Sequence, residues 1–216
     1  MARSARLVVP GLPHHVTQRG NNGAEVFFGD DDRRQYLLWL AEYASKYELK
    51  VWAYCLMSNH VHLVVVPTTE HALSSTLRAL QMRYANRINN QRDTTGHLWQ
   101  SRFYSCTLDD QHLQAAVRYV ERNPVRAGLG SRAEDYMWSS ARPHCGLRRD
   151  PVLAHDLPLL DMVADWSFWL SEPEDEAITI ALRGNTMKGK PCGDGNFIER
   201  LETLTGRDLS TKRLGD

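Results

Sequence analysis

The sequence lacks closely spaced cysteines and any long apolar run. Its four cysteines, Cys55, Cys106, Cys145 and Cys192, are far apart and form no C-x-x-C pair. This spacing excludes the usual cysteine-based zinc sites and is typical of reduced thiols in a cytoplasm. No stretch approaches the roughly 20 apolar residues of a membrane span, and the N-terminus carries no signal-peptide pattern. We therefore expect a cytoplasmic protein that does not associate with membranes.

The chain also lacks net charge, with 26 Lys and Arg against 26 Asp and Glu. A simple electrostatic nucleic-acid binder is commonly strongly basic, so the balance argues against that class. The distribution is uneven, since residues 1–140 carry 16 basic and 13 acidic side chains and residues 141–216 carry 10 and 13. Most basic residues of the first part are arginines, which suit phosphate, although a solvated helix face explains any single one equally well. The acidic stretch 172–176 suggests the hypothesis that it shields this basic surface from non-specific DNA.

Hydrophobic patterns predict strands and helices that interleave along residues 1–140. Short strands are expected at 14–18 and 26–28, two buried strands within 50–67, and a strand or hairpin within 97–108. Helices are expected over 36–47, 73–88 and 113–123, with a kink or stop at Pro124. The hairpin signals favour an α+β fold, an antiparallel sheet with helices packed on it, over a doubly wound parallel fold.

Beyond about residue 140 the pattern changes to proline-rich segments with few apolar repeats. A short helix is expected over 159–170, a loop bearing glycine and lysine over 184–195, and a final helix over 197–204. At 216 residues the chain is long enough for one domain of ordinary size with an appendage. We therefore divide it into a domain of residues 1–140 and a mostly helical or irregular extension of unknown role, residues 141–216.

Two histidines, His60 and His62, stand at the start of a strand that is apolar on both faces. Side chains alternate along a strand, so the two share a face and can bind one ion. Because the surrounding run is buried, an uncomplexed pair would cost desolvation. The alternative is two polar residues at the exposed start of a strand, since histidine is common at half-buried positions.

Tyr119 and Asn123 lie four residues apart on a predicted helix and therefore share a face. A tyrosine hydroxyl with its free pKa of about 10 is a weak nucleophile and needs activation by a base or a metal. Two imidazoles and an amide oxygen could hold a divalent ion that polarises a phosphate, and Mg²⁺ or Mn²⁺ suits such a shell. The four residues together suggest a metal-assisted tyrosine nucleophile that acts on a phosphodiester. Taken alone, Tyr119 is equally a boundary residue and Asn123 a helix-ending residue.

Four stretches of the chain carry a resemblance to a known family. The run Met57–Val64 resembles the HUH strand of the single-tyrosine transposases, and Tyr119–Val125 resembles the catalytic helix of their REP-associated branch. Leu98–Phe103 and Pro13–Asn21 fit the same branch, and the resemblance covers about residues 6–140. It implies a ferredoxin-like antiparallel sheet flanked by helices. It also implies a transposase that cuts single-stranded DNA at or near hairpin-forming repeats, leaving a 5′-phosphotyrosine and a free 3′-hydroxyl.

The resemblance also implies roles for individual residues. By motif position, Tyr119 is the nucleophile, His60 and His62 bind Mg²⁺ or Mn²⁺, and Asn123 is the third ligand. Some relatives carry glutamine at the position of Asn123, and the shorter amide reaches the ion only if the helix lies closer to the strand. The expected partner is single-stranded DNA with hairpin repeats, bound by a monomer or a homodimer that associates with the bacterial nucleoid.

Contacts to DNA are expected from residues within the stretches that carry the resemblance. Trp99 and Phe103 could stack on unpaired bases, while Arg19 and Arg102 could meet phosphates. The alternative for both aromatic residues is a place in the core. The zero net charge predicts few phosphate contacts and a shallow salt dependence of binding.

Two other functions stay open from the sequence. The first is a DNA-hairpin-binding protein that keeps the fold without catalysis. The second is a metallohydrolase in which the histidines bind zinc and activate water, which needs a third strong ligand. Candidates for this third ligand are His14, His15, Glu70 and His112, but none is spaced from the histidine pair as in a known zinc motif.

Overall fold

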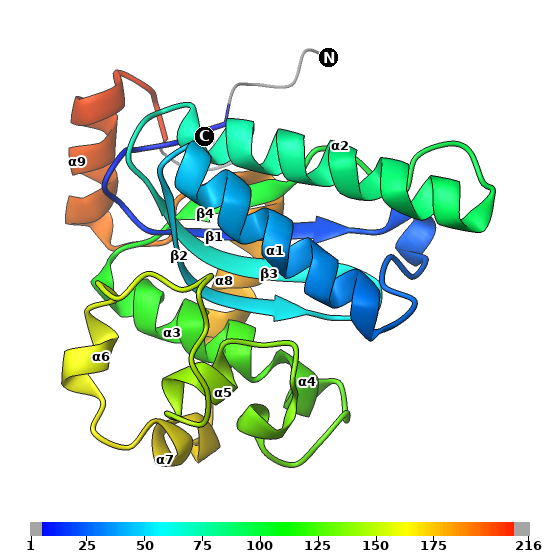
Figure 1. The fold of residues 1–216 in the computed structure, drawn as a ribbon. Coiled ribbons are helices and arrows are strands. Elements are labelled where there is room, and N and C mark those ends of the chain that lie inside the picture. Colours follow the sequence, from blue (N-terminus) through cyan, green and yellow to red (C-terminus); the bar gives the residue numbers. More distant parts are fainter. Residues whose placement is uncertain (1–5, 210–216) are drawn as a thin grey trace.

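The computed structural model describes residues 6–209, and its centre is a four-stranded antiparallel sheet in the order β2-β3-β1-β4 (Figure 1). The strands are β1 (His14–Arg19), β2 (Leu49–Leu56), β3 (His60–Pro67) and β4 (Tyr104–Thr107). β1 pairs with both β3 and β4, so it is an inner strand of the sheet. The predicted α+β fold, an antiparallel sheet flanked by helices, is confirmed.

Helices α1 (Asp30–Lys46) and α2 (Ala72–Arg92) cover one face of the sheet (Figure 1). α1 begins at three aspartates, whose charges favour the positive end of the helix dipole, and the Asp32 carboxylate accepts a hydrogen bond from the Phe28 backbone N–H at 3.0 Å. Every second residue of β3 packs into the core under these helices: Val61, Leu63 and Val65.

The opposite face is covered by α3 (Asp110–Glu121) and by α8 (Glu176–Lys188). Asp109 caps α3, because its carboxylate accepts from the His112 backbone N–H at 2.8 Å. The four-residue helix α4 (Asn123–Arg126) follows at once, with Pro124 in its first turn, which confirms the predicted break at Asn123.

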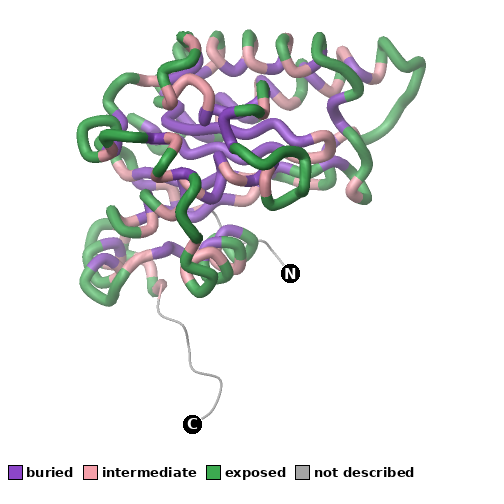
Figure 2. Tube along the Cα trace, turned by 90° about the horizontal axis from the view of Figure 1, so that it is seen from below, coloured by how far each residue is buried: buried purple, intermediate pink, exposed green. Residues whose placement is uncertain are grey.

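The remaining helices lie at the periphery. They are η1 (Asn21–Gly23), η2 (Ala133–Asp135), α5 (Ala141–His144), α6 (Leu159–Met162), α7 (Trp166–Ser171) and α9 (Gly195–Thr205). Figure 2 shows that the buried residues follow the strands through the middle of the molecule, while the helices expose one side. None of the helices within residues 6–209 is long and apolar enough to cross a lipid bilayer. All four cysteines are free thiols.

Two predictions about local structure are wrong. Residues 26–28 form no strand, because the backbone N–H groups of Val26 and Phe27 both bond the Ser58 carbonyl in a loop. The helix expected over 159–170 is two short helices, since the Asp165 carboxylate starts a new one by accepting from the Phe168 N–H at 2.8 Å. The strand or hairpin expected within 97–108 is confirmed as the single strand β4, preceded by an isolated bridge between Gly20 and Trp99.

The loop expected over 184–195 is also wrong, since residues 184–188 belong to α8. Two caps define this helix: the Asp175 carboxylate accepts from the Ile178 N–H at 3.1 Å, and Gly189 ends it with a φ of 68°. They outweigh the cost of about 1 kcal/mol for Gly184 inside a helix. α8 packs on β4 and α3, so the extension contributes to the core. The division at residue 140 stays a prediction.

Candidate functional site

Polar side chains gather on one face of the sheet where β1 and β3 pair. In this antiparallel register Thr17 lies opposite His62, and Arg19 lies opposite His60. Opposite residues point to the same side of a sheet, so two strands build one polar surface beneath α3 and α8. The ring centroids of His60 and His62 are 5.0 Å apart, as their shared face predicts.

Tyr119 and Asn123 reach this surface from the helical layer. The Tyr119 ring is 5.3 Å from the His62 ring, centroid to centroid, and stands nearly perpendicular to it. The Asn123 side chain hydrogen-bonds His60. Tyr119 and Asn123 are only 6% and 7% exposed, and no described residue hydrogen-bonds the Tyr119 hydroxyl. The structure thus brings together all four residues that the sequence selected.

These residues line a cavity of about 580 Å³ whose walls come from β1, β3, β4, α3, α4 and α8. Three arginines, Arg19, Arg126 and Arg183, also line it. A guanidinium binds two oxygens of one phosphate, so the lining suits a phosphodiester. The sequence selected Arg19 but not Arg183 of α8, because Arg183 lies outside every motif of the resemblance.

Burial holds the histidines of the cavity in the neutral form. It lowers the pKa of His60 to about 4, with a further contribution from the positive charge of Arg19. It also lowers the pKa of His62 well below its usual range and that of His15 to about 3. Neutral imidazole is the form that binds metal ions. Burial raises the pKa of the Tyr119 hydroxyl, while the charges of Arg126 and Arg183 oppose the rise.

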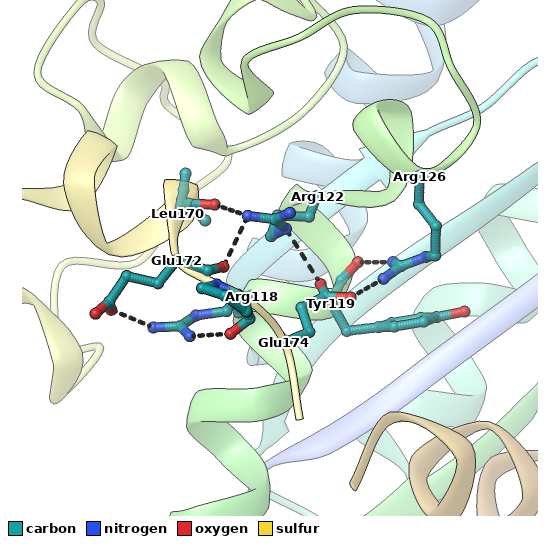
Figure 3. A network of polar contacts seen from close by, with 8 residues as sticks. Arg118, Tyr119, Arg122, Arg126, Leu170, Glu172 and Glu174 are labelled. Carbon is teal, nitrogen blue, oxygen red and sulfur yellow. Dashed lines mark hydrogen bonds and ion pairs between the residues drawn. The ribbon is translucent and has the colours of Figure 1, made fainter. Parts of the chain in front are cut away.

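Arg126 is held directly over the tyrosine. Its guanidinium carbon lies 4.1 Å from the centre of the Tyr119 ring, and its Nη2 donates to the Tyr119 carbonyl at 2.7 Å. It also forms an ion pair with Glu174 from the segment between α7 and α8. In Figure 3 the Tyr119 ring extends away from Arg118 and Arg122, and Tyr119 lines the cavity.

Two further arginines, one on α3 and one directly after it, are paired with the same acidic segment (Figure 3). We call α3, which carries Tyr119, the tyrosine helix. Arg118 donates to the Glu172 carboxylate at 3.2 Å, and Arg122 lies 3.6 Å from the Glu174 carboxylate. Arg122 also donates to the Glu172 carbonyl at 2.9 Å. The acidic stretch noted in the sequence therefore neutralises one face of the helix that carries Tyr119.

The residues expected to contact DNA lie in two places. Arg19 lines the tyrosine cavity, whereas Trp99, Arg102 and Phe103 line a second hollow of about 720 Å³ between α2 and the loop before β4. Trp99 and Phe103 are 8% and 6% exposed and belong to the core under α1 and α2. Their burial favours the core alternative, and base stacking by them stays a prediction. Gln100 lines both hollows, which adjoin there.

Of the four candidates for a third strong metal ligand, His15 lies next to His62, in contact with its Nδ1. The other three do not join the histidine pair. His14 lies on β1 one residue from His15, so its side chain points to the other face, and His112 bonds the Asp109 carboxylate at 2.7 Å. Glu70 is exposed. Within residues 6–209 no group of three His, Cys, Asp or Glu residues is placed to hold a metal ion.

Sequence reasoning missed the role of a residue pair behind His62. His15 of β1 lies on the same face, and its Nε2 is 3.0 Å from Nδ1 of His62. Its Nδ1 is 2.8 Å from Oγ1 of Thr186 on α8. The alternation of β1 could have indicated His15, but no local signal connects residue 186 with this site.

The motifs, the antiparallel sheet and the meeting of strand and helix place the molecule among the transposases. More narrowly, the chain belongs to the family of IS200-like transposases, whose family model matches residues 9–123. The match spans just over half of the chain and ends at Asn123, so it includes all four selected residues. It stops well before α8.

Two solved structures are similar to this chain. A REP-associated tyrosine transposase bound to a REP hairpin aligns with a TM-score of 0.57 and 18% identity, over 72% of this chain and 93% of that one. A Deinococcus radiodurans R1 protein, provisionally described as a transposase, aligns with a TM-score of 0.40 and 20% identity, over 56% of this chain and 97% of that one. No curated protein sequence matches significantly. The first alignment shows that this chain has the fold of a REP-associated tyrosine transposase.

Proposed function

We propose that this transposase cuts and rejoins single-stranded DNA with Tyr119 as its nucleophile. The observation that carries the proposal is the position of Tyr119. Its ring packs against His62, its hydroxyl has no partner among the described residues, and it faces a cavity that three arginines line. A hydroxyl that faces a cavity and has no structural partner is available to a substrate.

The proposed reaction is a transesterification. The Tyr119 hydroxyl oxygen attacks phosphorus, the bond from phosphorus to the 3′ oxygen breaks, and a 5′-phosphotyrosine forms. The hydroxyl proton passes to solvent and the departing 3′ oxygen takes up a proton, so no oxidant or energy donor is needed. The same step in reverse, with the 3′-hydroxyl of another strand, transfers the strand. Arg126 and Arg183 neutralise the charge that gathers on the phosphate oxygens.

His60, His62 and Asn123 fit a divalent ion, Mg²⁺ or Mn²⁺. Both imidazoles are neutral, and each has its Nδ1 in a hydrogen bond within the protein, which leaves Nε2 as the nitrogen for a ligand. The amide of Asn123 lies beside His60 in the wall of the same cavity, so it is available to the same ion. A bound ion would polarise the phosphate and stabilise the departing oxygen.

The proposed substrate is a strand with a hairpin next to the unpaired segment to be cut. The solved relative is bound to a REP hairpin, and this chain shares its fold over most of the length of that protein. Its arginines are few and partly paired, so we expect binding that weakens only gradually with salt. Whether the protein acts as a monomer or a homodimer stays a prediction.

A covalent adduct tests the nucleophile. The protein is incubated with MgCl₂ or MnCl₂ and a labelled single-stranded oligonucleotide that contains a hairpin repeat, and the adduct is resolved on a denaturing gel. We expect an adduct that Tyr119→Phe abolishes and EDTA prevents. Tyr104→Phe is the informative comparison, because Tyr104 lines the same cavity, and Tyr47→Phe, just after the end of the far helix α1, is the control.

The other outcomes separate the alternatives. An adduct that survives Tyr119→Phe but is lost in Tyr104→Phe would contradict the assignment of the nucleophile. Hairpin binding without any adduct would favour a protein that binds DNA without cutting it. Cleavage that survives both substitutions would favour hydrolysis by activated water.

A further inference from the structure

Both histidines of the proposed ion site are held from behind by hydrogen bonds to their Nδ1 atoms. We propose that Asn59 and the pair His15–Thr186 are positioning residues that keep His60 and His62 in the Nδ1–H tautomer. Both rings then present an unprotonated Nε2 to the cavity. The consequence for metal affinity rests on the proposed function, whereas the tautomers themselves do not.

The donor and acceptor of each hydrogen bond behind His62 can be assigned from the acceptor at the far end of the series, a backbone carbonyl. Thr186 Oγ1 is 2.7 Å from the Leu182 carbonyl oxygen, which can only accept, so the single hydroxyl proton is used there. Toward His15 the Thr186 oxygen must therefore accept, and the His15 Nδ1 at 2.8 Å must carry the proton. A neutral His15 then has a bare Nε2. The proton in its 3.0 Å contact to His62 consequently sits on the Nδ1 of His62.

A neighbouring thiol agrees with this assignment. Cys106 Sγ is 3.1 Å from Thr186 Oγ1, and the hydroxyl has no second proton to donate to it. The thiol donates instead, and the Cys192 thiol donates in turn to Cys106 Sγ at 3.7 Å. Thr186 thus accepts twice and donates once, which is the full capacity of a hydroxyl.

A different residue determines the tautomer of His60. The Asn59 amide nitrogen donates to the Gly23 carbonyl at 3.0 Å, which fixes the orientation of the amide. Its oxygen therefore faces His60 and lies 2.6 Å from the ring Nδ1, which must be protonated. The Asn59 carbonyl also accepts from the Gly20 N–H at 2.8 Å, so the turn before β3 is anchored at both its side chain and its backbone.

Burial makes these contacts decisive. His15 and Thr186 are each 1% exposed, and His62 is 7% exposed, so water does not compete for their polar atoms. Partners behind metal-binding histidines fix the ring orientation and commonly change metal affinity 10–100-fold when they are removed. Thr186 lies outside the family match at residues 9–123, so the extension supplies part of the support for the site.

The test reads the tautomers in the metal-free protein by long-range ¹H–¹⁵N NMR of the imidazoles. Wild type should show Nδ1–H for both His60 and His62. Thr186→Val, which keeps the shape and removes the acceptor, should shift His62 alone toward Nε2–H, and Thr186→Ser should restore it. Asn59→Ala should shift His60 alone. Thr203→Val is the matched control, because Thr203 makes the same bond to the carbonyl four residues earlier on the exposed side of α9.

Metal affinity is read separately by EPR titration of Mn²⁺. Thr186→Val and Asn59→Ala should each bind Mn²⁺ at least about 10-fold more weakly than wild type, while Thr203→Val binds normally. An Nε2–H tautomer of either ring in the wild type would overturn the proposal. So would unchanged tautomers in Thr186→Val and Asn59→Ala. If His60 and His62 are both Nδ1–H in the wild type but the protein binds no Mn²⁺, the positioning stands and the metal part of the proposed function fails.

Discussion

Glu121 is a fully buried carboxylate that ties the segment after the tyrosine helix to that helix. It lies at the end of α3, two residues after Tyr119. Its Oε1 accepts from Ser140 Oγ at 2.5 Å and from His144 Nδ1 at 2.6 Å, and its Oε2 accepts from Trp166 Nε1 at 2.7 Å.

Glu121→Gln should therefore destabilise the fold strongly although it hardly changes the volume. Glutamine keeps one accepting oxygen and replaces the other by an NH₂ group, which then faces a buried donor. One hydrogen bond to a charged acceptor contributes about 1.5–3 kcal/mol, and a donor left without an acceptor adds to the loss. We expect the free energy of unfolding to fall by about 2–4 kcal/mol, which lowers the melting temperature by roughly 5–15 °C.

Urea denaturation followed by tryptophan fluorescence measures this loss. Glu199→Gln on the exposed side of α9 is the control and should change the free energy by less than about 0.5 kcal/mol. Trp166→Phe removes one of the three donors, so its combination with Glu121→Gln should cost less than the sum of the two. A Glu121→Gln protein within about 0.5 kcal/mol of wild type would refute the reasoning, since the carboxylate would then be replaceable by an amide.

Two further predictions follow from charged and titratable groups. Burial lowers the pKa of His14 to about 4, against about 6.5 in an unfolded chain, so between these values the unfolded state binds more protons and stability falls as the pH falls. Between pH 7 and 5, protonation of His14 in the unfolded chain should lower the free energy of unfolding by about 2 kcal/mol. In His14→Gln this free energy, measured by urea denaturation, should therefore fall less steeply with falling pH than in wild type. Equal slopes for the two proteins would contradict this. For the shielding hypothesis, the double substitution Glu172→Gln/Glu174→Gln should tighten binding of unrelated single-stranded DNA several-fold at low salt and less at high salt, as measured by fluorescence anisotropy. An unchanged affinity would count against shielding, and deletion of residues 141–216 is no substitute because it removes the core helix α8.

The selected residues could be predicted because each pair obeys a local periodicity. His60 and His62 share a face by the alternation of a strand, and Tyr119 and Asn123 by the turn of a helix. That these two faces meet depends on how α3 lies over β3, and the predicted break at Pro124 helped, because it marks where the helix ends beside the strand. The resemblance supplied the pairing that periodicity could not.

The rest could not be predicted, because it depends on contacts between distant parts of the chain. Thr186 and His15 are 171 residues apart and meet only because α8 packs on β4 and β1. Glycine and lysine around residues 184–190 suggested a loop, and only the caps and the packing of Leu182 in the core reveal a helix. Likewise, the pairing of Glu174 with Arg126 is a tertiary contact. The uneven charge distribution suggested that acidic residues of the extension shield basic ones, but it did not indicate which residues pair.

The distance along the chain between His15 and Thr186 has a consequence for how the protein folds during its synthesis. A ribosome finishes the strand pair and the tyrosine helix long before it reaches α8, so a growing chain holds its motifs without the support behind His62. A protein built this way completes the support behind His62 only when synthesis is nearly over. For the same reason, a chain that ends before residue 186 keeps every motif of the resemblance but lacks the partner of His15.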